Sequence, residues 1–151
     1  MNLQTGKSQG VGAGIIYNLP TQNIGFELRW EYEFEKFVFA PQAAYYPGIG
    51  PINEFYASVS LHYRPIELGI FMPYLLANVG YNGWINHAVS PDPDAKFSNW
   101  SAQGGIGLTT NKCTRPYLEY RINAKWNEAT LRLGLIYTFN CRKWYICDSY
   151  L

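Results

Sequence analysis

The chain has 151 residues, which predicts a single domain. Charged residues make up 15% of it, against about 25% in typical soluble domains, and its net charge of +1 gives no electrostatic basis for binding nucleic acid. The most apolar stretch, Gly69–Tyr81, is shorter than the roughly 18 residues of a membrane-spanning helix, so a helical membrane protein is disfavoured. Residues Met1–Lys7 lack the apolar segment of a signal peptide, which leaves open a cytosolic protein or a mature chain whose leader was removed.

Apolar and polar residues alternate through the first half of the chain. Successive side chains of a β-strand point to opposite faces, so this alternation predicts strands with one apolar and one polar face. Residues that favour turns separate these segments, as in Pro47–Pro51. The predicted strands are Gly10–Asn18, Ile24–Tyr32, Phe37–Tyr45 and Phe55–Tyr63.

The same pattern continues in the second half, interrupted by one long irregular stretch, Asn82–Ser98. The predicted strands there are Phe71–Tyr81, Trp100–Thr109, Tyr117–Trp126 and Glu128–Phe139. The eight segments predict an antiparallel up-and-down arrangement, because short hairpin connections join neighbouring strands. Pro41 and Pro73 fall inside predicted strands, so we expect a bulge or local irregularity at each, since proline cannot donate a ladder hydrogen bond.

The two faces of these strands differ in the size of their side chains as well as in polarity. The apolar face carries no Asp, Glu, Lys, Arg or His and is rich in Phe, Trp, Tyr and Leu, whereas Gly, Ala, Ser, Thr and Asn dominate the opposite face. The interior of an eight-stranded barrel is just wide enough for side chains to fill, so it suits the small polar face. The sequence therefore predicts an all-β, closed, eight-stranded antiparallel transmembrane β-barrel with a filled polar lumen. A soluble lipocalin-like barrel or a sandwich with a large apolar core is the alternative.

The final segment, T-L-R-L-G-L-I-Y-T-F over residues 130–139, resembles the last strand of small bacterial outer-membrane barrels of the OmpA, OmpX and opacity-protein type. This segment and P-Y-L-E-Y-R over residues 116–121 are most similar to small barrels of Bacteroidetes-type bacteria. The resemblance covers Gly10–Phe139 as a pattern, and it departs from that family because twelve residues follow Phe139.

The resemblance implies a location in the bacterial outer membrane, with both termini in the periplasm and the longer loops outside. The chain then divides into a barrel, 1–139, and a periplasmic tail, 140–151. The implied partners are the lipid bilayer with its lipopolysaccharide and a larger outer-membrane complex, bound through the tail or the lipid-facing surface. We expect a scaffold, an adhesion protein or an accessory subunit. We expect no open pore, no enzymatic activity, no cofactor, no metal and no nucleic-acid partner.

Charged and hydrogen-bonding residues of the polar face are the candidate lumen site. Buried charges persist only when they are paired and hydrogen-bonded, so we expect Glu27 and Glu31 to pair with Arg121 and Arg132 across the lumen. This network would act as a plug, and an ion path through it is the alternative. The full predicted polar network is Glu27, Arg29, Glu31, Tyr56, His62, Gln103, Tyr117, Glu119, Arg121 and Arg132, with Lys125 also on this face.

An enzyme of the lipid A deacylase type is the rival hypothesis. His62 shares the polar face with Ser58, Ser60 and Glu54, residue types that can form a nucleophile and its base. Such an enzyme must present its nucleophile to lipid, whereas these residues point inward. The last strands also lack a His-x-Ser sequence, so we expect no catalytic site.

Two further groups of residues lie outside the predicted lumen. We expect Trp84, Ile85, Val89 and Phe97 to form an apolar part of the long loop that contacts the barrel rim or a partner. Cys113 falls in a predicted periplasmic turn, and Cys141 and Cys147 follow the last strand. Disulfides persist in that compartment, so we expect Cys113 to pair with Cys141 or Cys147, or those two to pair with each other.

Overall fold

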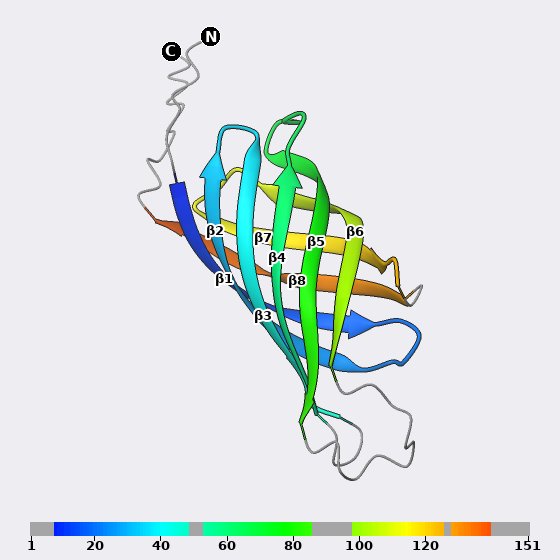
Figure 1. The fold of residues 1–151 in the computed structure, drawn as a ribbon. Coiled ribbons are helices and arrows are strands. Elements are labelled where there is room, and N and C mark those ends of the chain that lie inside the picture. Colours follow the sequence, from blue (N-terminus) through cyan, green and yellow to red (C-terminus); the bar gives the residue numbers. More distant parts are fainter. Residues whose placement is uncertain (1–7, 49–52, 86–97, 126–127, 140–151) are drawn as a thin grey trace, which may run out of the picture.

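The computed structural model describes residues 8–48, 53–85, 98–125 and 128–139, which form a closed antiparallel barrel in which each strand pairs with its sequence neighbours (Figure 1). The first and last strands close the barrel, with Gly14 opposite Gly134. This confirms the predicted closed, eight-stranded, up-and-down architecture. The strands are β1 (Ser8–Asn18), β2 (Ile24–Phe34), β3 (Phe37–Tyr46), β4 (Asn53–Tyr63), β5 (Phe71–Ile85), β6 (Ser98–Thr110), β7 (Thr114–Asn123) and β8 (Glu128–Phe139).

The two ends of the barrel differ in their connections. At one end, here the terminal end, lie the start of β1, the end of β8 and the connections 35–36, 64–70 and 111–113. At the other, the loop end, β1, β3, β5 and β7 end and β2, β4, β6 and β8 begin. The described part of the chain has no helix long and apolar enough to span a membrane.

Strand boundaries differ most from the prediction in β5 and β7. β5 continues to Ile85, so the predicted loop start at Asn82 was wrong, and β7 spans Thr114–Asn123 rather than Tyr117–Trp126. β7 contains Pro116, which pairs with Leu135 of β8 but lies beyond the last β6–β7 pair. Proline is tolerated there because its missing N–H would face a side without a partner strand.

Proline affects the ladder at only one of the two positions where an irregularity was expected. The β2–β3 pairing is interrupted between the pairs Arg29–Gln42 and Tyr32–Phe39, although the register is the same on both sides. Pro41 has no N–H to donate to the carbonyl of Trp30. The β5–β6 register passes through Pro73 without a break, and β4 has already ended where the missing N–H would point. The expectation is confirmed at Pro41 and wrong at Pro73.

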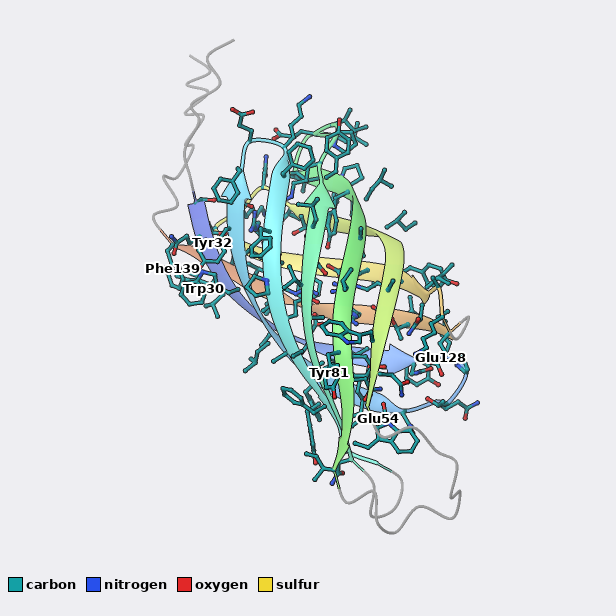
Figure 2. All side chains as sticks on the ribbon, in the orientation of Figure 1. Trp30, Tyr32, Glu54, Tyr81, Glu128 and Phe139 are labelled. Carbon is teal, nitrogen blue, oxygen red and sulfur yellow. The ribbon has the colours of Figure 1, made fainter. Side chains whose placement is uncertain are left out.

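The large apolar side chains lie on the outside of the barrel. Leu133 is 59% exposed and Leu118 is 51% exposed, whereas Glu119 and Arg121 are fully buried. Trp30 packs against Phe139 with ring centroids 5.6 Å apart and lies with it on the outer wall toward the terminal end (Figure 2). A soluble barrel would bury these groups, so the soluble alternative is wrong and the polarity of the fold is that of a barrel surrounded by hydrocarbon.

Candidate functional site

Two buried carboxylates organise the middle of the lumen, Glu27 on β2 and Glu119 on β7. Arg29 lies between them and donates to Glu27 through Nε at 3.1 Å and to Glu119 through an Nη1 hydrogen bond of 2.6 Å. Its guanidinium also stacks over the ring of Tyr117, 3.9 Å from the centroid. Because β2 and β7 are not adjacent strands, the bonds between Arg29 and Glu119 cross the lumen and help to fill it.

Two further arginines and two tyrosines complete this cluster. Arg121 donates to Glu119 through Nε at 2.8 Å and Nη2 at 2.6 Å, and Arg132 donates to Glu27 at 2.5 Å. The hydroxyls of Tyr74 and Tyr117 donate to Glu119 and Glu27 at 2.7 and 2.6 Å. The central cluster is defined here as Glu27, Arg29, Glu119, Arg121 and Arg132.

A second ionic cluster closes the lumen toward the terminal end. Arg115 of β7 bonds Glu31 at 2.8 Å and also bonds Glu33. Arg64, next to the end of β4, bonds Glu33 and lies 3.7 Å from Glu31, and the hydroxyl of Ser8 also donates to Glu33. The terminal cluster, Glu31, Glu33, Arg64 and Arg115, therefore joins parts of the barrel that are not adjacent.

The loop end of the lumen is polar but carries fewer ion pairs. Glu54 and Glu128 lie there (Figure 2), and Asn82 and Trp84 donate to the Glu54 carboxylate. Asn82 also bonds Tyr56, whose ring packs edge-on against Tyr46 with centroids 5.8 Å apart. The polar residues at this end are therefore held together mainly by hydrogen bonds between neutral groups and a carboxylate, and not by a network of ion pairs.

The structure brings together most of the predicted lumen residues, with different partners for several of them. Arg121 pairs with Glu119 rather than with Glu27 or Glu31, and Glu31 belongs to the terminal cluster. Gln103 accepts a hydrogen bond from Arg132 at 3.3 Å. The expected lumen position of Lys125 is wrong, because β7 ends at Asn123 and the exposed Lys125 donates to Asn99 at 3.2 Å.

Sequence reasoning missed Glu33, Arg64 and Arg115 because it placed them in turns at the terminal end. It also missed Tyr74 and Gln42, although both occupy the polar positions of their strands. The alternation of inward and outward side chains along a strand predicts both Tyr74 and Gln42, if it is applied to every residue of the strand and not just to the charged ones.

His62 makes no hydrogen bond to the other members of the His–Ser–Glu set within the described residues. Ser60 and His62 are fully buried in the lumen, and Ser60 accepts a hydrogen bond from Asn78 at 2.8 Å. His62 stacks on Tyr74 with ring centroids 4.8 Å apart, and neither ring nitrogen has a hydrogen-bond partner within the described residues. Across the same residues, no group of three or more His, Cys, Asp or Glu side chains could hold a metal ion.

The predicted loop and cysteine residues divide between described and undescribed parts of the chain. Trp84 and Ile85 lie on β5, so their assignment to the loop was wrong, whereas Val89 and Phe97 lie outside the described residues. Cys113 lies in the β6–β7 connection, and its carbonyl accepts a 2.9 Å hydrogen bond from Thr138 of β8. Cys141, Cys147 and the whole of the predicted tail lie outside the described residues.

The outer wall carries a hollow of about 670 Å³ where small side chains replace large ones. Pro41, Ala43 and Ala57 lie in it, and Trp30 and Trp100 are among the larger residues around them. The interrupted β2–β3 pairing at Pro41 falls at this hollow. Its lining is mostly apolar, as expected for a surface in contact with hydrocarbon, and Arg29, Gln42 and Ser58 are the polar residues in it.

No protein-family model matches this sequence, and no curated protein matches it. The N-terminal β-barrel domain of Pseudomonas aeruginosa OprF is similar in structure, with a TM-score of 0.67 at 16% identity over 90% of this chain and 100% of that chain. Ail, the attachment invasion locus protein of Yersinia pestis, gives 0.56 at 20% identity over 88% and 99%. The outer membrane enzyme PagL gives 0.56 at 13% identity over 85% and 97%.

These neighbours have different roles, one of them enzymatic, so the likeness concerns the fold. Together with the exposed apolar wall and the buried ionic lumen, it establishes that this chain has the fold of the small eight-stranded transmembrane β-barrels.

Proposed function

We propose that this chain is a closed structural barrel of a bacterial outer membrane that acts as a scaffold, an adhesion protein or an accessory subunit. It is neither an open pore nor an enzyme. The observation that carries the proposal is the ionic network, which crosses the lumen at the central cluster and again at the terminal cluster. A permeation pathway would need a continuous hydrated route past both.

The proposed orientation places the terminal end in the periplasm and the loop end outside, next to lipopolysaccharide. Short connections at the terminal end, such as Glu35–Lys36 and Asn111–Cys113, support this orientation, because periplasmic turns of such barrels are short. Partners would then meet the protein through the outer loops, through the tail, or through the hollow on the lipid-facing wall.

A disulfide in the periplasm is part of this proposal. The hydrogen bond from Thr138 to Cys113 holds the last turn against the end of β8, just before the segment that contains Cys141 and Cys147. We expect Cys113 to pair with Cys141 or Cys147, or those two to pair with each other. Thiol titration of protein from an oxidising periplasm should find one free thiol, and three reactive thiols would contradict the pairing.

Planar-bilayer recording tests the closed lumen. The refolded protein should change its gel mobility on heating and give no steady single-channel current. The double variant Arg29→Ala/Glu119→Ala removes a pair that crosses the lumen, so it should conduct more than the wild type once its heat-modifiable mobility shows that it has folded. Large steady currents from the wild type would overturn the proposal of a plug.

Expression in a lipopolysaccharide-producing host tests the enzymatic alternative. The mass of lipid A should not change, because Ser60 and His62 are enclosed in the lumen. A mass shift that Ser60→Ala abolishes would establish an enzyme. Capture of the tagged barrel from outer membranes in mild detergent tests the accessory role, where a stoichiometric membrane partner is expected and a barrel recovered alone would exclude a stable complex.

A further inference from the structure

Two buried arginines converge on one neutral oxygen in the lumen. The Nη1 groups of Arg121 and Arg132 lie 3.1 and 3.4 Å from Oε1 of Gln42. Gln42 is 6% exposed, Arg132 is 4% exposed and Arg121 is fully buried. Charged donors of this kind usually converge on a carboxylate or another anion, and a neutral amide oxygen adds no counter-charge to their ion pairs with Glu119 and Glu27.

The charges of the central cluster do not balance. It contains the carboxylates of Glu27 and Glu119 and three guanidinium groups, those of Arg29, Arg121 and Arg132. The terminal cluster holds two of each, and Arg29 also lies 3.9 Å from Glu31, so the two clusters together hold four carboxylates and five guanidinium groups. The excess is therefore a single positive charge, and it lies in a buried region where an unpaired charge is costly.

The two central carboxylates have little capacity left to compensate this excess. Glu119 already accepts hydrogen bonds from Arg29, Arg121 and Tyr74. Glu27 accepts from Arg29, Arg132 and Tyr117.

Of the two carboxylates at the loop end, Glu54 has different partners. Glu54 is bonded by Asn82 and Trp84, and the ion pairs of Arg121 and Arg132 within the described residues are with Glu119 and Glu27.

Two N–H donors of these residues have no partner within the described residues, Nε2 of Gln42 and Nε of Arg132. The orientation of the Gln42 amide follows from its surroundings, because its oxygen must face the two guanidinium groups and its nitrogen must point elsewhere. Unpartnered buried donors beside an uncompensated positive charge have the chemistry of an anion site.

We propose that the lumen binds one small monovalent inorganic anion, of the halide class, against Arg121, Arg132 and Gln42. The single excess charge calls for a monovalent ion. The narrow interior of an eight-stranded barrel, already filled by side chains, favours a halide over a larger oxyanion. The ion would act as the missing counter-charge of the plug, which no residue of the central cluster supplies.

Substitution of Gln42 provides a matched pair of variants. Gln42→Glu supplies a carboxylate between the two arginines, so it should abolish anion binding. Gln42→Met is similar in length and uncharged. It removes the amide N–H but leaves the excess positive charge in place, so it should weaken anion binding without abolishing it.

Anomalous diffraction from crystals grown in bromide reads the site directly. We expect a bromide peak beside Gln42 in the wild type and in Gln42→Met, and none in Gln42→Glu. The wild-type crystals decide the question even if neither variant folds, since a water or no density at this position would overturn the proposal. A peak that persists in Gln42→Glu would identify an adventitious ion only.

Thermal unfolding in detergent gives an independent measurement. At constant ionic strength, replacing gluconate by chloride should raise the unfolding temperature of the wild type and leave that of Gln42→Glu unchanged. Equal chloride effects on both proteins would contradict the site. Neither measurement depends on loops, partners or conductance, so its failure would not bear on the proposed structural role.

Discussion

At the scale of single residues, the carboxylates of Glu27 and Glu119 act as hubs, because each accepts hydrogen bonds from two arginines and a tyrosine. Each carboxylate binds one arginine of its own strand and further groups from strands that are not adjacent to it. Removing one therefore leaves Arg121 or Arg132 without its carboxylate partner, and Arg29 with one fewer, in a buried region. This costs more than the loss of the bonds themselves.

Glu119→Gln should lower the free energy of unfolding by about 3–5 kcal/mol, the usual cost of breaking a buried ion pair. Urea unfolding of the protein refolded in detergent measures this loss. Glu35→Gln is the control, because Glu35 lies exposed in the β2–β3 turn and its change should be close to zero. Equal effects of the two substitutions would show that the lumen pairs contribute nothing specific.

Small residues make room for the tyrosine that bonds Glu27. A Cβ atom added at Gly134 would overlap the hydroxyl of Tyr117 and the backbone carbonyl of Ala13. Gly104 lies on the outer wall of β6, and a Cβ there would meet no atom within 4 Å. The two glycines therefore differ in surroundings although both lie within strands.

Gly134→Ala should destabilise the barrel by about 1–3 kcal/mol, because overpacking forces Tyr117 or the backbone of β1 to move. Gly104→Ala should be neutral or slightly stabilising, since it only restricts the unfolded chain. Both values come from the same urea titration. A neutral result for Gly134→Ala would mean that Tyr117 can reorient without cost. Its hydrogen bond to Glu27 would then contribute little to the free energy of unfolding.

At the scale of the strands, the β2–β3 pairing has a gap in the middle of its ladder, which is called the seam below. Pro41 interrupts this ladder, and the hollow on the lipid-facing surface lies over the same place. A backbone carbonyl without a partner is costly in hydrocarbon, so the seam should open more readily than the other strand pairs.

Pro41→Val supplies the missing N–H donor and should stabilise the barrel by about 1 kcal/mol, the net value of one hydrogen bond. Hydrogen exchange should show the new amide at position 41 to be protected. Pro73→Val is the control, since the N–H that it adds would point to where β4 has ended and should gain no bond. Rapid exchange at position 41 would show that the seam is not held open by the proline.

Much of this architecture follows from the sequence because strand parity is strict. Every predicted strand exists, and the inside-out polarity follows from residues such as Leu133 and Glu119, which occupy opposite parities. The start of β7 was harder to predict, because proline at position 116 resembles a strand boundary. Cross-lumen partners were not predictable, because parity says which side chains point inward but not which of them meet.

At the scale of the whole molecule, the distribution of polarity is the reverse of that in a soluble protein. Ion pairs and hydrogen-bonding groups fill the lumen, and aromatic and aliphatic groups cover the wall, with Trp30, Tyr32 and Phe139 gathered toward the terminal end (Figure 2). In a bilayer, the cost of placing a charge on such a wall depends on depth, being largest at the midplane and small at the interfaces.

This depth dependence makes a last prediction. Leu133 lies in the middle of β8, where it pairs with Ile15 and Leu118, and Phe34 is the last residue of β2 at the terminal end; both point outward. In lipid vesicles, Leu133→Arg should cost about 2–4 kcal/mol of unfolding free energy and Phe34→Arg about 0–1 kcal/mol. Equal costs at the two depths would mean that the wall does not face a hydrocarbon layer, since only such a layer distinguishes two outward-facing positions by their height on the barrel.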